Sequence, residues 1–152
     1  MWYIIISVVV FLWLLFNWAS PFALLQKAHP LSRSRLPAEL LDWDKDAKVK
    51  FYVANLIGGA ALGIWAPPMS IIIFDKTFLT NANAPLLRFV IAHELAHFNQ
   101  GHHRKRWLAV VSLAFLFPAV RRWLARMEDE ADIIAEAQTG RARKQFPQLR
   151  VS

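Results

Sequence analysis

A chain of 152 residues has room for one compact domain and an appendage, and the absence of cysteine excludes a disulfide framework and a thiolate metal site. Any metal ion would therefore be bound by His, Asp or Glu. The net charge of +7 and the hydrophobic fraction of 56% are typical of a polypeptide at an anionic membrane surface, and the aromatic residues lie inside apolar runs, which excludes a stacking surface for nucleic acid.

The first segment is expected to be a transmembrane anchor. No charged side chain occurs from Trp2 to Leu25, and this run is long enough to cross a hydrocarbon core as a helix. A cleaved signal peptide is the alternative, but the segment has no basic n-region, and Pro21 follows the small residues where cleavage would be needed. Basic residues follow the run, so the positive-inside rule places the rest of a single-pass protein on the cytoplasmic face.

Residues 27–37 are rich in Pro, Ser and Arg and are expected to form a juxtamembrane linker, with a short helix beginning at Pro37. Farther along, Val49, Phe51 and Val53 alternate with more polar residues. An alternation of this kind predicts a strand with one buried face.

An uncharged run over residues 51–74 has the hydropathy of a membrane segment. Gly58-Gly59 and Pro67-Pro68 interrupt it, and such pairs break helices and suit turns between strands. We therefore expect strands of a small sheet, with an interrupted membrane helix as the alternative. The strand around Ile71–Phe74 is expected to present an open edge along which an extended peptide binds.

Four of the five histidines lie in the segment HELAHFNQGHH, residues 93–103. The segment belongs to a long helical pattern that Gly101 ends. His93 and His97 are four residues apart, so they lie on one face of a helix and can bind one zinc ion, and Glu94 is close enough to act on a metal-bound water. The motif predicts zinc-dependent hydrolysis with Glu94 as the catalytic residue.

Two residues are candidates for the third protein ligand. His103 lies ten residues after His93, but the motif with that spacing requires glycine at position 100, where this chain has Gln100. In the second candidate segment, RMEDEADIIAEA, Glu128 and Asp132 lie on one face of a predicted helix. Glu128 would bind zinc while Asp132 orients one of the bound imidazoles, and a solvated acidic helix face is the alternative.

The sequence HELAHF, followed by E-x-E-A-D about thirty residues later, resembles the gluzincin metallopeptidases of the HtpX and CAAX prenyl protease type, including the short minigluzincins. The resemblance covers approximately residues 48–137. It implies that His93, His97 and Glu128 bind one zinc ion per chain. It also implies that Asp132 contacts one of these ligands without binding the metal itself. It also implies an α+β fold, in which a zincin-like domain with a short antiparallel or mixed sheet, an active-site helix and a glutamate helix follows the N-terminal transmembrane helix.

An uncharged run, Trp107–Val120, separates the two motifs. Basic clusters flank both of its ends, which indicates that both ends stay on one side of a membrane, as a shared metal site requires. We expect a connecting helix that packs on the active-site helix or enters the membrane interface beside the anchor. His102 and His103 are expected to belong to the polar collar around this run.

The expected domains are a transmembrane anchor (1–26), the linker (27–37), a zincin-like metallopeptidase domain (38–140) and a basic C-terminal tail (141–152). The tail suits lipid contact, and the alternative is that it lies in the cleft and restrains activity.

These features predict a membrane-anchored zinc metalloendopeptidase that acts on a peptide or protein substrate. Glu94 would accept a proton from the zinc-activated water and deliver it to the leaving amine. Arg126, His102 and His103 are the candidates for stabilising the oxyanion. The alternatives are a non-catalytic, membrane-tethered interaction or scaffold protein and a secreted peptidase with His103 as a zinc ligand.

Overall fold

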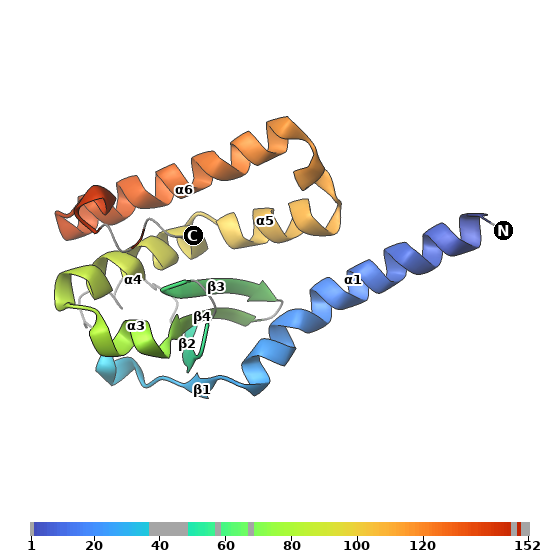
Figure 1. Cartoon of the computed structure of the whole chain (residues 1–152). Helices are drawn as coiled ribbons and strands as arrows, with labels where there is room; N and C mark the ends of the chain where they lie inside the picture. Colours follow the sequence, from blue (N-terminus) through green and yellow to red (C-terminus); the bar gives the residue numbers. More distant parts are fainter. Residues whose placement is uncertain (1, 37–48, 57–58, 67–68, 147–148, 150–152) are drawn as a thin grey trace.

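The N-terminal segment is one helix, α1 (Trp2–Gln26), that extends away from the rest of the molecule (Figure 1). The computed structural model describes residues 2–36, 49–56, 59–66, 69–146 and 149. Among the helices of these ranges, none combines the length and the apolarity that a membrane span requires. The expected transmembrane anchor is therefore a helix, as predicted, but its role as a span is not supported by the structure.

Among the described residues, four strands form a single mixed sheet. They are β1 (His29–Pro30), β2 (Val49–Ala54), β3 (Ala61–Ala66) and β4 (Met69–Asp75), in the order β1-β2-β4-β3. The pair of β2 and β4 is parallel, and the two other pairs are antiparallel. The α+β fold with a short mixed sheet is thus confirmed, and the described residues of the uncharged run 51–74 belong to strands and their turns.

The edge of the sheet differs from the prediction. Ile71–Phe74 lie in β4, between β2 and β3, and each of these four residues is 0% exposed. Four consecutive apolar residues are typical of a strand that is buried on both faces, whereas an exposed edge favours alternation. The prediction of an open edge at Ile71–Phe74 is therefore wrong, and β3 is the edge strand on the side of the helices.

Two helices, α4 (Ala84–Asn99) and α6 (Pro118–Thr139), lie on one side of the sheet (Figure 1). α4 buries Phe89 and Ile91 against Phe51 and Phe74 of the sheet. α6 packs on α4 through Ala131 and Ala135, which are both 0% exposed. The remaining described elements are the 3-10 turns η1 (Arg33–Arg35), η2 (Ala114–Leu116) and η3 (Arg143–Gln145), and the helices α3 (Lys76–Asn81) and α5 (His102–Val111).

Three segments differ in secondary structure or burial from the prediction. The linker 27–37 contributes β1 and η1, and the short helix expected from Pro37 lies outside the described residues. The run Trp107–Val120 is not one connecting helix, because α5 ends at Val111 and α6 begins at Pro118. In the expected C-terminal tail, Phe146 is buried and its ring packs on Phe89 with 5.3 Å between centroids.

Asp75 joins the sheet to the helical layer. Its Oδ1 accepts a hydrogen bond from the N–H of Phe78 at 2.8 Å, and its Oδ2 accepts one from the N–H of Leu56 at 2.9 Å. These bonds cap α3 and hold the end of β2, and the bond from Phe78 is the main reason why the pKa of Asp75 is lowered.

We predict that Asp75→Ala lowers the free energy of unfolding by about 1 kcal/mol at neutral pH, the usual cost of losing an N-cap. Since the pKa of Asp75 is lower in the folded protein, its contribution is present above the unfolded value of about 3.8 and is lost as the pH falls through the folded value. Urea unfolding at pH 7 and at pH 3 measures this, with the exposed Glu136→Ala as the control. An equal deficit at both pH values would contradict the prediction.

Candidate metal centre

The active-site helix begins and ends as its sequence predicts. The side chain of Asn83 accepts a hydrogen bond from the N–H of Leu86 at 2.9 Å and so caps α4. At the other end, Gly101 has a φ of 66°, a left-handed conformation that glycine adopts without strain. This turn directs the chain back, so that His102 and His103, the first residues of α5, are buried beside α4.

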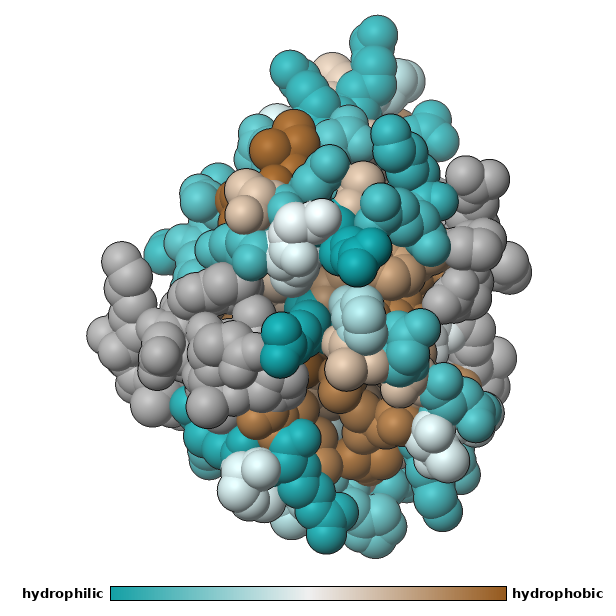
Figure 2. Space-filling model, turned by 90° about the vertical axis from the view of Figure 1, so that its left-hand side faces the viewer, coloured by the Kyte–Doolittle hydropathy of each residue, from teal (hydrophilic) through white to brown (hydrophobic). Residues whose placement is uncertain are grey.

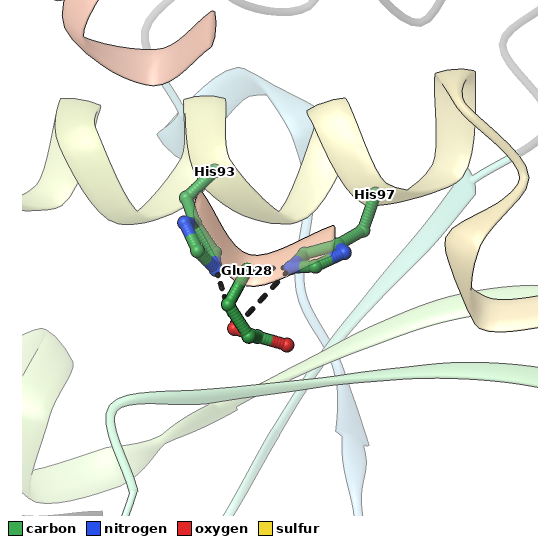
Figure 3. A group of neighbouring side chains, drawn as sticks. All are labelled: His93, His97 and Glu128. Carbon is green, nitrogen blue, oxygen red and sulfur yellow. Dashed lines mark hydrogen bonds and ion pairs between the residues drawn. The ribbon is translucent and has the colours of Figure 1, made fainter. Parts of the chain in front are cut away.

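Three ligand atoms from two helices converge on one point (Figure 3). His93 Nε2 lies 3.1 Å from His97 Nε2, and Glu128 Oε2 of α6 lies 3.5 Å from the first and 3.6 Å from the second. Tetrahedral zinc with bonds of about 2.0–2.1 Å keeps its ligand atoms roughly 3.4 Å apart. The donor set and its spacing therefore fit one zinc ion. Among the described residues, this is the group of His, Asp and Glu whose ligand atoms lie close enough together, within 4.8 Å of one another, to bind a metal ion.

The electrostatics of the group also favour a cation. Contacts with the two imidazoles hold the pKa of Glu128 well below its usual range. Burial alone would lower the pKa of His93, but the carboxylates of Asp132 and Glu128 outweigh it and raise this pKa to about 9. Positive charge is thus stabilised where the three ligand atoms meet.

The second nitrogen of His93 faces a carboxylate. His93 Nδ1 lies 2.8 Å from Asp132 Oδ1, and the other oxygen of Asp132 accepts a hydrogen bond from Arg143 at 3.1 Å. Metal-bound imidazoles usually have such a partner, which fixes the ring and its tautomer. Asp132 thus lies beside the second nitrogen of His93, and Arg143 extends the contact to η3.

The second nitrogen of His97 has a different partner, one that the sequence did not predict. His97 Nδ1 lies 3.1 Å from His102 Nδ1, and His102 Nε2 lies 3.2 Å from Glu130 Oε2. If His97 binds a metal through Nε2, its proton is on Nδ1 and is donated to His102, whose own proton then faces Glu130. His102 is 2% exposed, so it supports the centre from inside and is not part of an exposed collar as expected.

His103 lies beside Glu94 and not in the ligand group. Its Nε2 is 3.7 Å from Glu94 Oε2, and its ring packs on Phe98 with 4.2 Å between centroids. Burial, with the charges of His97 and Arg106, lowers the pKa of His103 to about 3, so the ring is neutral. Burial raises the pKa of Glu94. The structure therefore brings Glu128, and not His103, to the histidine pair.

A cavity of about 390 Å³ opens over the ligands and Glu94. Of the three candidates for stabilising an oxyanion, His103 lines it, whereas Arg126 and His102 do not. Two further cations that sequence reasoning missed also line it. Arg106 forms an ion pair with Glu128 Oε1, which leaves Oε2 facing the histidines, and Arg143 holds Asp132. In the sequence, both are single members of basic clusters, so no local signal marks them.

The edge strand approaches the centre at Gly63. A Cβ at this position would lie 2.2 Å from His103 Nε2 and 2.6 Å from Glu94 Oε2. Glycine is therefore required here because of the close approach of β3, although its φ is ordinary.

A comparison with protein-family models matches residues 50–148 to peptidase family M48, about two thirds of the chain. The chain belongs to peptidase family M48. The match includes both motifs of the metal centre, and M48 peptidases are zinc-dependent, in agreement with the donor set. No curated protein matches the chain significantly.

We predict that Gly63→Ala lowers the free energy of unfolding by about 1–3 kcal/mol, because the added Cβ would displace the ring of His103, which is buried. The control is Gly59→Ala, whose Cβ would meet its nearest atom at 3.8 Å. Urea unfolding of the two variants measures the difference. Equal stabilities would show that β3 adapts and that the close approach is not a constraint.

We also predict that Glu128→Ala lowers zinc affinity by more than the roughly 10–100-fold that loss of an outer-shell partner costs. His103→Ala should keep the metal, because His103 lies outside the ligand group. Chelator competition and zinc content per chain measure both. Metal loss in the His103 variant alone would move the third ligand to His103.

Proposed function

We propose that this M48 peptidase is a zinc-dependent endopeptidase of the HtpX and CAAX prenyl protease type. The observation that carries the proposal is the convergence of His93 and His97 of α4 with Glu128 of α6, in a cavity that Glu94 also lines. A carboxyl group next to a metal centre, in a cavity that admits a peptide, is the arrangement that peptide hydrolysis requires.

Each residue of the centre has its own role in the proposed hydrolysis. Zinc held by His93, His97 and Glu128 would supply Lewis-acid chemistry, polarising the peptide carbonyl and acidifying a water. Glu94 accepts the proton of the attacking water and delivers it to the leaving amine. Its raised pKa suits both steps, because a carboxyl group that is too acidic is a weak base. Asp132 positions His93, and neutral His103 is the candidate donor to the carbonyl oxygen.

An extended substrate would bind along β3. This strand is at one end of the described sheet, and Ala61, Leu62 and Gly63 line the cavity. Backbone pairing with an edge strand holds a peptide with little dependence on its sequence. The absence of a side chain at Gly63 would bring the scissile bond near Glu94. Phe78, Phe89 and Val90, also in the cavity wall, favour an apolar substrate side chain.

Attachment to a membrane through α1 is the second part of the proposal. Many large apolar side chains of this helix are exposed, among them Val9 at 60%, Phe11 at 63% and Phe16 at 68%. An apolar surface of this length is normally shielded from water by another molecule. For an uncharged helix, a lipid bilayer is suited to this role. The domain would then lie on the cytoplasmic face, as the basic residues after α1 indicate.

We predict that Glu94→Gln abolishes chelator-sensitive hydrolysis of a fluorescent casein, with kcat reduced by at least about 100-fold, the lower range for loss of a general base. Zinc content should remain, because Glu94 is not a ligand. Glu136→Gln, which changes an exposed carboxyl group on α6, is the control and should leave the rate unchanged.

Activity that survives in the Glu94 variant would remove this residue from the mechanism. If zinc-loaded wild-type protein cleaves no peptide, this result would favour the hypothesis of a non-catalytic scaffold protein.

A further inference from the structure

A second apolar surface lies at the turn between α5 and α6. We call residues 107–120 the hairpin tip; they are the end of α5, η2 and the first residues of α6. Leu116 and Phe117 are 62% and 66% exposed there, and Leu108 and Leu113 are 49% and 39% exposed. The face that points away from the free end of α1 shows hydrophilic residues over its upper part and apolar residues in its lower centre (Figure 2).

The hairpin tip lies beside α1 (Figure 1). The rings of Trp13 and Phe115 stack with 6.5 Å between their centroids. Trp13 is near the middle of the uncharged part of α1, about 20 Å along the helix from Lys27, the first charged residue after it. Whatever layer surrounds the middle of α1 therefore also surrounds the hairpin tip.

The backbone of the hairpin tip is suited to an apolar layer. The N–H groups of Ser112, Leu113, Leu116 and Phe117 donate to carbonyls within the turn, over 3.0–3.1 Å. The hydroxyl of Ser112 donates to the carbonyl of Leu108 at 2.7 Å. Backbone that enters hydrocarbon must satisfy its polar groups internally, and these bonds do so for four N–H groups of the turn.

The backbone of Leu113 is an independent observation at the same turn. Its φ is 57°, a conformation that costs a leucine about 1–2 kcal/mol and a glycine nothing comparable. The turn nevertheless exposes a leucine there. Strain of this kind is retained where the side chain has a role that glycine cannot fill.

The flanks of the hairpin tip carry positive charge. Arg104 and Lys105 precede it, Arg121 and Arg122 follow it, and all four are exposed. An apolar tip between basic flanks is complementary to a bilayer with anionic headgroups, in which the tip enters the acyl region and the basic side chains contact phosphate.

We propose that the hairpin tip inserts into the same anionic bilayer as α1 and forms a second point of contact. The proposal rests on the membrane attachment proposed above and is independent of peptidase activity. Two contacts that are far apart in the sequence fix the orientation of the domain, whereas α1 alone would leave it free to rotate. α6 runs from the tip to Glu128 over about 15 Å, so the metal centre is held close to the membrane surface.

The absence of cysteine allows a direct test by spin labelling. Single variants Leu116→Cys, Phe117→Cys, Val9→Cys and Ile133→Cys of the full chain would be labelled and reconstituted into vesicles of phosphatidylcholine with phosphatidylglycerol. Ile133 on α6 is the matched control, because it is 66% exposed and outside the hairpin tip. The measurement is the ratio of collisions with oxygen, which enters the bilayer, to collisions with a water-soluble nickel chelate.

We expect ratios at Leu116 and Phe117 that are several-fold higher than at Ile133 and close to that at Val9. A high ratio at Val9 with water-like ratios at Leu116 and Phe117 would overturn the proposal and leave the attachment through α1 in place. Water-like ratios at all four positions would overturn both. Protection at Leu116 from both reagents, with spin–spin broadening that grows with protein density, would show that a second copy covers the tip and would also overturn the proposal.

Discussion

The close contact between α4 and α6 is the constraint on which the metal centre depends. Two ligands lie on one helix and the third on the other, and their atoms meet within 3.6 Å only because the helices approach at Ala131 and Ala135. Both alanines are 0% exposed, so a larger side chain at either would separate the helices. A shift of about 1 Å is enough to spoil metal and catalytic geometry.

Around this contact, each imidazole ligand has its own support. His93 is held by Asp132 and Arg143, and His97 by His102 and Glu130. The two sets come from different elements: η3 contributes to the first and α5 to the second, while α6 contributes to both. Arg106 adds a third constraint by occupying the oxygen of Glu128 that does not face the histidines. The centre is therefore preorganised from several sides, which reduces the reorganisation that metal binding requires.

What the sequence predicted depends on how local each feature is. Spacing within one helix places His93 beside His97 and Glu128 beside Asp132, so these relations follow from 3.6 residues per turn. The identity of the edge strand does not follow from local pattern, because the order β1-β2-β4-β3 is decided by pairing across the whole sheet. Local pattern also does not show which residues of the two basic clusters line the cavity, because the contacts of Arg106 and Arg143 are made with a distant segment of the chain. His102 was misjudged because only the left-handed turn at Gly101 brings it against α4.

The continuity of α6 has a consequence for changes in chain length. Glu128, Glu130, Asp132 and the two contact alanines all lie within one uninterrupted helix. Inserting or deleting a single residue after Pro118 and before Glu128 would turn everything that follows by about 100° relative to the tip. An insertion between Glu128 and Asp132 would change their relative positions, so that Glu128 could no longer face the metal while Asp132 contacts His93. Natural variation in length should therefore be confined to the turn between α5 and α6, and the stretch from Met127 to Ala135 should behave as an indivisible unit.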